Sequence, residues 1–472
     1  MSCDAKTDVR RGRTSTRSVR LLFLAVTATT FVMLLVRSPF AQDVVTVEPG
    51  DDLQAAVDRV AAGGELRLGA GQYRIAEPTR ITTPGITLKA LPPASARLVA
   101  SNDFSGGPLV HVSVPNVTIS GITFDGQFIR NVRGVRGVRN KDNPEDGAIG
   151  LVVENCELTR LTRHAVDIDG HRSIVRGTRI HKILWNEHGE RRDAHGVVTT
   201  FAKGLRIENV DISQCSGDAF QAERGSWDDL RITDSHLWDS PLEEDMAGFS
   251  KGTYVSENAI DTKHRYSDRG HIAIVNCRIH GFRSKLINNT SALNLKENVD
   301  AVIDSCDVYN SQIGFRLRGR GKGMSMFPLL MNCVVRNNGI AFRLENKLRK
   351  FRMFHCTMFQ NRSALAWGPS RKTWSRSYYD WDPSQWSNVN NLWIGVRKLP
   401  EIASSSRLGA VNNVRLTREA VADDLSPRHG GSAVETPPVV ESWYEPTGRV
   451  LKDKAGRKRK KPSTVGAYEA VN

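Results

Sequence analysis

Hydrophobic and polar residues alternate along most of this chain in short runs. Each repeat has an alternating run, a turn with a small residue, Asn or Cys, and a second alternating run, and the repeats begin at Val117, Leu151, Ser173, Leu205, Leu230, Ile272, Ala301, Leu329 and Met353. A period of two is typical of β-strands, and its recurrence indicates a repeat architecture. We therefore expect one long β-solenoid instead of several separate domains.

The cysteines give the length of the repeat. Cys277, Cys306, Cys333 and Cys356 hold the same place in successive repeats, at spacings of 29, 27 and 23 residues. Such spacings match one coil of a right-handed parallel β-helix, in which each coil buries its inward side chains on the next. The sequence thus predicts an all-β, right-handed parallel β-helix with a short N-terminal capping helix.

The seven cysteines also suggest an internal ladder. Cys156 occupies the same turn position as the four above, and Cys215 lies close to it. Neighbouring coils lie about 4.8 Å apart, so these thiols are expected to stack without forming bonds. The functional alternative is that the cysteines bind a metal or form disulfides, but the sequence contains no CxxC pair.

The ends of the solenoid carry their own signals. A short helix is expected after Asp51 as its cap, ending at Gly63-Gly64, and the solenoid is expected over residues 43–368. Residues 369–448 are predicted to form a cap, because four of the nine tryptophans lie between 371 and 400; a sugar-stacking platform is the alternative. Residues 449–472 are read as a basic tail with a final strand near Val465.

The N-terminus has the pattern of an export segment. Residues 1–20 are rich in arginine, and 21–42 contain the apolar run Leu21 to Val36, which Arg37 ends. This run suits a signal peptide or an uncleaved signal anchor, with the basic flank cytoplasmic and the bulk exported. We expect a secreted or periplasmic protein, or one anchored to the inner membrane by residues 21–36.

Composition and charge narrow the classes of function. The 472 residues are 39% hydrophobic and 25% charged, which excludes a disordered chain or a multispan membrane protein. The net charge of +15 is concentrated at the two ends, which supply 12 of these charges. The body is near neutral, so we expect no nucleic-acid partner, and a monomer that contacts the membrane only through its N-terminal segment.

One outward face carries the candidate chemistry. Aligning the second runs on their inward residues (Val166, Phe220, Ile260, Leu293, Phe315 and Phe342) places an outward column on one face. In chain order the column reads Asp167/Asp169, Gln221/Glu223, Asp261/Lys263, Asn294/Lys296, Arg316/Arg318 and Arg343/Glu345. This passage from acidic to basic within a few coils indicates a site, and a surface ladder of ion pairs is the structural alternative.

The centre of that column is the segment Glu257-Asn-Ala-Ile-Asp261-Thr-Lys263. Converging carboxylates suit a hard cation such as Ca²⁺, and nearby lysines and arginines suit a polyanion. The segment, followed by HIAIVNCRIHGF, resembles the Ca²⁺-binding strand of pectate lyases. Asp218-Ala-Phe, Leu230-Arg-Ile-Thr-Asp-Ser-His and Arg316-Leu-Arg-Gly-Arg resemble further elements of that family, so that the resemblance covers about residues 215 to 325.

The resemblance implies a polysaccharide lyase that cleaves an acidic, pectate-like polysaccharide by β-elimination. Asp218, Glu257 and Asp261 would hold Ca²⁺, and Arg316 would take the C5 proton. Lys263, Lys285, Lys296, Arg318 and Arg320 would bind carboxylates. Since an arginine base is chemically demanding, Lys263, Lys285 and Lys296 remain alternatives for the base.

Other functions remain open. A glycoside hydrolase on the same fold would use Asp167, Asp169 and Glu223, and a non-catalytic polysaccharide-binding or structural β-helix would need no such column. Alginate and glycosaminoglycans stay open as substrates. A histidine-rich segment from His181 to His195, near His164 and His171, is expected to form an inserted loop, and a solvated loop is its simplest interpretation; walling the substrate cleft and binding a transition metal are the functional alternatives.

Overall fold

The structure is a computed structural model. It describes residues 42–143, 146–265, 268–319, 324–368, 383–420, 454 and 466–467. The chain divides into two units, Met1–Pro39 and Phe40–Asn472. The first unit lies outside the described residues, as does the expected export segment except for its last residue, Gln42, which begins β1. No helix within the described part of the chain is long and apolar enough to cross a membrane.

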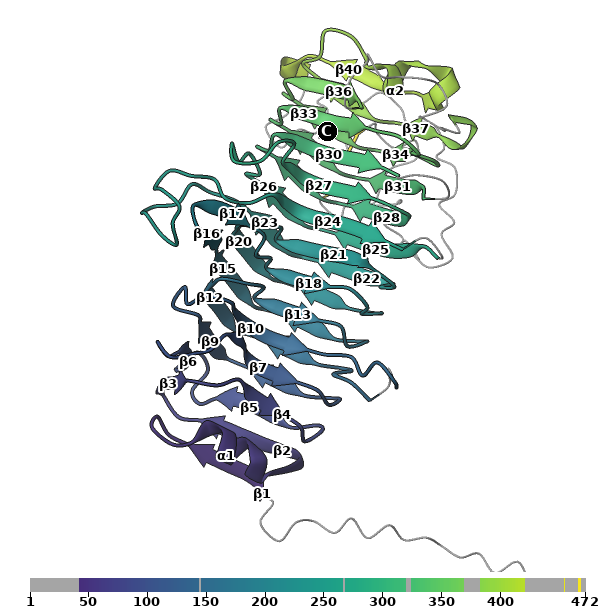
Figure 1. Cartoon of the computed structure of the whole chain (residues 1–472). Coiled ribbons are helices and arrows are strands. Elements are labelled where there is room, and N and C mark those ends of the chain that lie inside the picture. The colour runs from purple at the N-terminus through teal and green to yellow at the C-terminus, as the bar shows by residue number, and fades with distance from the viewer. Residues whose placement is uncertain are drawn as a thin grey trace, which may run out of the picture. The chain divides into compact units, whose positions relative to one another are not determined.

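Three long parallel sheets wind around a common core in the second unit (Figure 1). Sheet A has fourteen strands: β1 (Gln42–Val47), β2 (Val60–Leu68), β5 (Thr87–Ala90), β8 (Thr118–Ser120), β11 (Val152–Glu154), β14 (Ile174–Arg176), β19 (Arg206–Glu208), β22 (Leu230–Thr233), β25 (Gly270–Val275), β28 (Val299–Asp304), β31 (Met326–Met331), β34 (Arg352–Phe354), β37 (Ser387–Val389) and β39 (Ala410–Val411). Sheet B has thirteen: β3 (Gly71–Ile75), β6 (Ala96–Ala100), β9 (Ile122–Asp125), β12 (Glu157–Leu161), β15 (Arg179–Ile183), β20 (Asp211–Cys215), β23 (His236–Trp238), β26 (Arg278–His280), β29 (Asp307–Tyr309), β32 (Val334–Arg336), β35 (Thr357–Phe359), β38 (Leu392–Ile394) and β40 (Val414–Leu416).

Sheet C, which carries the predicted column, has eleven strands. They are β4 (Thr79–Ile81), β7 (Gly107–Val112), β10 (Val132–Gly137), β13 (Val166–Ile168), β18 (Val197–Thr199), β21 (Phe220–Gly225), β24 (Asn258–His264), β27 (Ser291–Lys296), β30 (Ile313–Arg318), β33 (Ile340–Leu344) and β36 (Ser363–Trp367). Each strand pairs in parallel with the equivalent strand of the next coil, as a β-helix requires. The predicted right-handed parallel β-helix is confirmed.

The sharp turn between sheets A and B explains the repeated Asn-Cys pattern. The residue before the cysteine is left-handed, with φ of 52° at Asn155, 54° at Asn276 and 53° at Asn332. Asparagine tolerates this conformation better than most residues with a side chain. Cys156, Cys277, Cys306, Cys333 and Cys356 are buried and unbonded, as the ladder predicts. Cys215 is instead the last residue of β20, paired with Ile183.

The first coil is covered by a helix and a strand. Helix α1 (Leu53–Arg59) buries Leu53, Ala56 and Val57. Its cap is Asp52, whose carboxylate accepts a hydrogen bond from the backbone of Ala55 at 3.0 Å. The expected cap, Asp51, lies one residue earlier and accepts from the backbone of Glu48 instead. The helix ends before Val60, so that the expected stop signal, 63–64, lies inside β2.

Sheets A and B continue past residue 368, where the sequence predicts the cap to begin. Strands β37 to β40 add coils over residues 387–416, accompanied by α2 (Glu401–Ser404), η3 (Pro383–Gln385), η4 (Ser406–Leu408) and η5 (Arg418–Ala420). Asn391 and Asn413 take the turn position of the cysteines and are joined by a side-chain hydrogen bond of 2.9 Å. This change of residue type hides the repeat from the sequence pattern.

The described tryptophans of this region are buried. Trp386 and Trp393 are 4% and 0% exposed and lie against Phe351 and Phe342, which suits a covering role and leaves neither ring free to stack on a sugar. Within the basic tail, Ala467 is buried against Val334 of sheet B and neighbouring residues. The rest of that tail, with the expected final strand at Val465, lies outside the described residues except for 454 and 466–467.

Candidate functional site

The predicted column lies along the outer face of sheet C. The strand register pairs Gln221 with Asp261, Asp261 with Asn294, Asn294 with Arg316, and Arg316 with Arg343. The six inward residues on which the alignment rests are buried and also paired in register. Between Asp167 and Gln221 the structure adds a coil that the alignment omitted, represented in the column by Val198.

A tight cluster of opposite charges forms the centre of the column. The Asp261 carboxylate is 2% exposed, with Oδ1 2.9 Å from the Lys296 Nζ and Oδ2 3.2 Å from the Lys263 Nζ. The Gln221 amide also donates to Oδ2, at 3.2 Å. Burial acts against the charge on Lys263, but the carboxylates of Asp261, Asp218 and Glu223 outweigh it and raise the Lys263 pKa. Lys263 is therefore a stable ammonium at neutral pH.

Asp218 is buried and lies two residues before β21 of sheet C. Its Oδ1 accepts hydrogen bonds from the backbone and the side chain of Asn258, at 3.1 and 2.8 Å. Its backbone N–H donates to Nδ1 of His195 at 2.8 Å, which places the proton of the neutral imidazole on Nε2. Burial raises the pKa of Asp218 well above its usual range, helped by the charges of Glu257 and Asp261, and burial lowers the pKa of His195 to about 4.

An inserted hairpin contacts one edge of the site. Strands β16 (Trp185–Glu187) and β17 (Glu190–Arg192) pair antiparallel, and they account for the loop that the sequence predicts here. Arg191, the middle residue of β17, lies 3.1 Å from Glu257 and 3.0 Å from Asp193. A loop over residues 239–257 packs beside it through an apolar cluster that includes Leu184 and Phe249. The ion pair between Arg191 and Glu257 thus joins the hairpin to the residue just before β24.

An arginine cluster lies on the other side of Asp261. Glu345 is 4% exposed and accepts a hydrogen bond from Nε of Arg316 at 2.8 Å. Its carboxylate also lies 2.9 Å from Nε of Arg343 and 3.8 Å from Arg318. Burial lowers the pKa of Arg343, and the neighbouring guanidinium groups of Arg316 and Arg318 add to this effect although Glu345 opposes it. Three guanidinium groups thus share one buried carboxylate.

The acidic end of the column is centred on Asp167. Its carboxylate lies 3.6 Å from both Arg133 and Arg136. Burial raises the pKa of Asp167 to about 6, with contributions from the charges of Asp169 and Glu223. Asp169 accepts hydrogen bonds from two backbone N–H groups, at 2.8 and 3.1 Å. This end therefore holds a carboxyl group that is readily protonated next to other carboxylates.

The structure brings together most of the residues predicted for the site. Asp218, Glu257, Asp261, Lys263 and Lys296 surround the centre, and Arg316 and Arg318 lie on the next coil. Lys285 lies on the loop before β27, where it is exposed and lines a separate hollow with Arg283 and Gln312. Arg320 lies outside the described residues.

The three carboxylates expected to hold Ca²⁺ do not form a ligand set as they lie. Asp261 is engaged by two ammonium groups, Glu257 by Arg191, and Asp218 by the amide of Asn258. No group of three or more His, Cys, Asp or Glu side chains in the described ranges is placed to hold a metal ion. The residues present therefore do not fit calcium in this arrangement.

Four of these five histidines contact other residues of the described chain. His181 lies 3.0 Å from Glu157, and His171 accepts from the backbone of Lys203 at 3.1 Å. His164 stacks on His195, with ring centroids 5.1 Å apart. His188 lies at the tip of the β16–β17 hairpin. The five rings are thus spread over the coil and the hairpin.

Sequence reasoning missed the partners that orient the site. Asn258 lies next to Glu257 in the segment already singled out, but its hydrogen bonds reach Asp218, 40 residues away. Arg191 and Glu345 come from other coils, and only the acid-to-base column gave a signal for Glu345. Ion pairs between coils depend on register, which the sequence gives only approximately.

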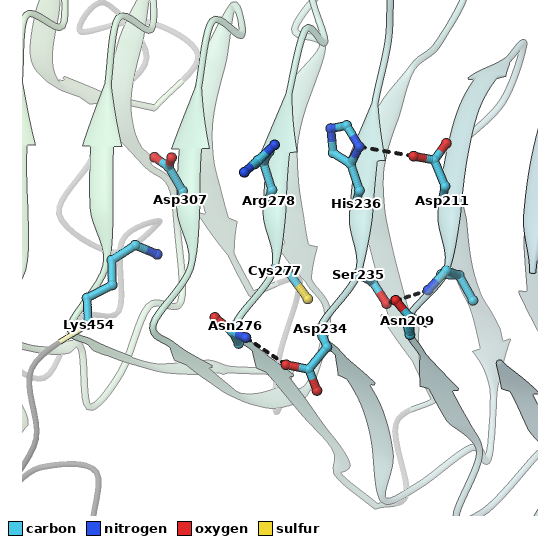
Figure 2. A pocket seen from close by; sticks show the side chains of 11 residues that line it. Asn209, Asp211, Asp234, Ser235, His236, Asn276, Cys277, Arg278, Asp307 and Lys454 are labelled. Atoms are coloured by element: carbon cyan, nitrogen blue, oxygen red, sulfur yellow. Dashed lines mark hydrogen bonds and ion pairs between the residues drawn. The ribbon is translucent and has the colours of Figure 1, made fainter. Parts of the chain in front are cut away.

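A separate hollow of about 590 Å³ lies at the corner between sheets A and B. Figure 2 shows His236 directed at Asp211 and Asn276 directed at Asp234 in this hollow. His236 lies 3.0 Å from Asp211, and Asn276 donates to Asp234 at 2.6 Å. None of the residues predicted for the site lines this hollow. We therefore place the candidate site on sheet C.

Comparisons with known proteins give similar folds only. No model of a protein family matches the chain, and no curated protein sequence matches it. Among solved structures, pectate lyase Pel9A is 12% identical, with a TM-score of 0.45, over 91% of this chain and 97% of that one. An alginate lyase from Paenibacillus sp. str. FPU-7 is 13% identical, with a TM-score of 0.42, over 65% and 98%.

A third solved structure is the A-module of the mannuronan C-5 epimerase AlgE4 from Azotobacter vinelandii. It is 14% identical, with a TM-score of 0.41, over 67% of this chain and 93% of that one. The parallel β-helix itself is established by the sheets described above.

Proposed function

We propose that this protein is a polysaccharide lyase that cleaves a uronic-acid-containing polysaccharide by β-elimination on the outer face of sheet C. The observation that carries the proposal is the cationic centre, in which Lys263 and Lys296 are fixed on Asp261 beside the arginines of the next coils. A flat, rigid sheet with fixed cations suits an extended polyanion, because the charges need no reorganisation when the polymer binds.

In the proposed reaction the lysines bind the uronate carboxylate and so stabilise the negative charge that develops when the C5 proton leaves. A base takes that proton, the C4–O bond breaks, and its electron pair goes to the leaving oxygen, which takes a proton from water. A double bond forms between C4 and C5. The protonated base then returns its proton to solvent, so that the enzyme is regenerated without an oxidant or reductant.

Arg316 is the proposed base. A neutral guanidine is demanding because free arginine has a pKa above 12. It lies beside Arg343 and Arg318, and the three guanidinium groups share the one buried carboxylate of Glu345. Lys263 is less suited to be the base, because its carboxylate neighbours stabilise the ammonium form. We assign Lys263, Lys296 and Arg318 to carboxylate binding.

A second candidate function is a glycoside hydrolase that uses Asp167, Asp169 and Glu223. It is favoured by the raised pKa of Asp167 together with the position of that residue on the same face, since hydrolysis needs one protonated and one ionised carboxyl group. Hydrolysis would produce reducing ends without a double bond. The two candidates therefore give different products from one substrate panel.

The test is the ultraviolet absorbance of the conjugated unsaturated uronide, recorded with pectate, alginate and glycosaminoglycans. We expect a rise on at least one uronan, a loss of at least 100-fold in Arg316→Ala, and no loss in Arg278→Ala, which removes an exposed arginine from sheet B. New reducing ends without absorbance would support the hydrolase. Binding without either product would support the non-catalytic alternative.

A further inference from the structure

The centre of the site has the features of a cation site, but it is occupied by side chains. Oδ1 of Asp261 and Oδ1 of Asn294 are buried oxygens that receive no hydrogen bond, and the two residues are paired on β24 and β27. Buried oxygens without a donor are costly unless a positive charge lies near them. The ammonium of Lys296 meets this need at Asp261, where it lies 2.9 Å from Oδ1 as an ion pair.

The second ammonium completes the arrangement. Lys263 lies 3.2 Å from the other oxygen of the same carboxylate, so each oxygen of Asp261 faces one ammonium group. The Lys296 side chain is only 9% exposed, whereas that of Lys263 is 28% exposed. Lys296 is thus a nearly enclosed charge, and Lys263 presents part of its surface to solvent, where a substrate carboxylate can reach it.

We infer that Lys263 and Lys296 replace the divalent cation in this protein, so that Asp261 is a positioning residue for two ammonium groups and not a metal ligand. Two ammonium groups carry the same formal charge as one Ca²⁺. A calcium ion on Asp261 would have to displace both, and it would be repelled by them at short range. The role of these two lysines in binding a substrate carboxylate rests on the proposed function, but the exclusion of calcium does not.

Calcium binding by the full chain tests the inference without any substrate. Isothermal titration at pH 8 is expected to show no calcium site at Asp261 in the wild type. The double variant Lys263→Met/Lys296→Met removes both charges at similar side-chain length and leaves the oxygens of Asp261, Asn294 and Gln221. We expect it to gain calcium affinity by at least tenfold, and we expect this gain to be lost when Asp261→Asn is added.

Two further variants keep the test decisive. Lys89→Met breaks an ion pair of 2.8 Å on sheet A and should gain no calcium affinity, which controls for the loss of any lysine. Lys296→Arg keeps the charge and should behave as the wild type, so it tests the role of the charge even if the double variant fails to fold.

The outcomes are distinguishable from failure of the proposed function. A calcium site in the wild type that Asp261→Asn abolishes would overturn the inference, whether or not the protein is a lyase. A folded double variant without any gain in affinity would also overturn it. If the gain is seen while no uronan is cleaved, the exclusion of calcium stands and the proposed function falls.

Discussion

Asp239 offers a prediction about stability whose sign and size follow from its surroundings. It lies just after β23, at the base of the loop over residues 239–257, and its Oδ2 accepts the backbone N–H of Ser256 at 3.1 Å. Its Oδ1 is buried without a hydrogen-bond partner. Burial raises the pKa of Asp239 from 3.8 to about 7, although hydrogen bonds from Ser256 oppose the shift. The folded protein therefore holds this proton up to neutral pH.

The raised pKa makes Asp239 destabilising at high pH. Between pH 3.8 and 7 the folded state binds more protons at this site than the unfolded state, so stability falls as pH rises through that window. Three pKa units correspond to about 4 kcal/mol, and the part lost between pH 5 and pH 8 is about 2.5 kcal/mol. Asp239→Asn cannot ionise, and its amide oxygen still accepts the Ser256 N–H.

The assay is urea denaturation of wild type and Asp239→Asn at pH 5 and pH 8. We expect the free energy of unfolding of Asp239→Asn, minus that of the wild type, to be higher by about 2.5 kcal/mol at pH 8 than at pH 5, which means that the variant is relatively more stable at pH 8. Glu244→Gln, an exposed acid in the same loop, should show no such change. A difference between Asp239→Asn and the wild type that does not vary with pH would refute the reasoning.

Two more predictions concern the core. Phe342→Ala should lower the free energy of unfolding by about 3–5 kcal/mol, because the ring is fully buried and stacks on Phe315 with centroids 5.3 Å apart. The same measurement on Leu286→Ala, 53% exposed, should give a change within about 0.5 kcal/mol, and equal losses would contradict the packing argument. The six described cysteines are all buried, so in a Cys3→Ser background no thiol should react with a disulfide reagent until urea unfolds the coils. A thiol that reacts in the native protein would show that the ladder opens.

The sequence predicts the coils well because the repeat is local. Alternation fixes which residues point inward, and Asn-Cys turns mark three of the passages from sheet A to sheet B, at 155–156, 276–277 and 332–333. The outer column follows from the same alternation, including Asp261 and Arg316. The sequence alignment of the column misses Val198 of β18, because an apolar residue on the outer face does not mark that face as polar.

The arrangement inside the site was less predictable. Whether Asp261 faces a metal or two lysines depends on side-chain positions on two neighbouring strands, and these follow from register and burial. The same applies to Glu257, whose partner Arg191 lies on a hairpin 66 residues earlier in the chain. Motif spacing alone cannot tell a ligand set from a set of ion pairs, because both need the same residue types.

The regular spacing of the strands also fixes the length of the column on sheet C. From Asp167 to Arg343 the column takes six steps from strand to strand, which at about 4.8 Å per step is a span of about 29 Å. Each coil contacts mainly its two neighbours, so loss or gain of one coil between these residues would change the span by one step and leave the chemistry at either end in place. The number of coils between the acidic and basic ends would then set the shortest polymer that can reach both.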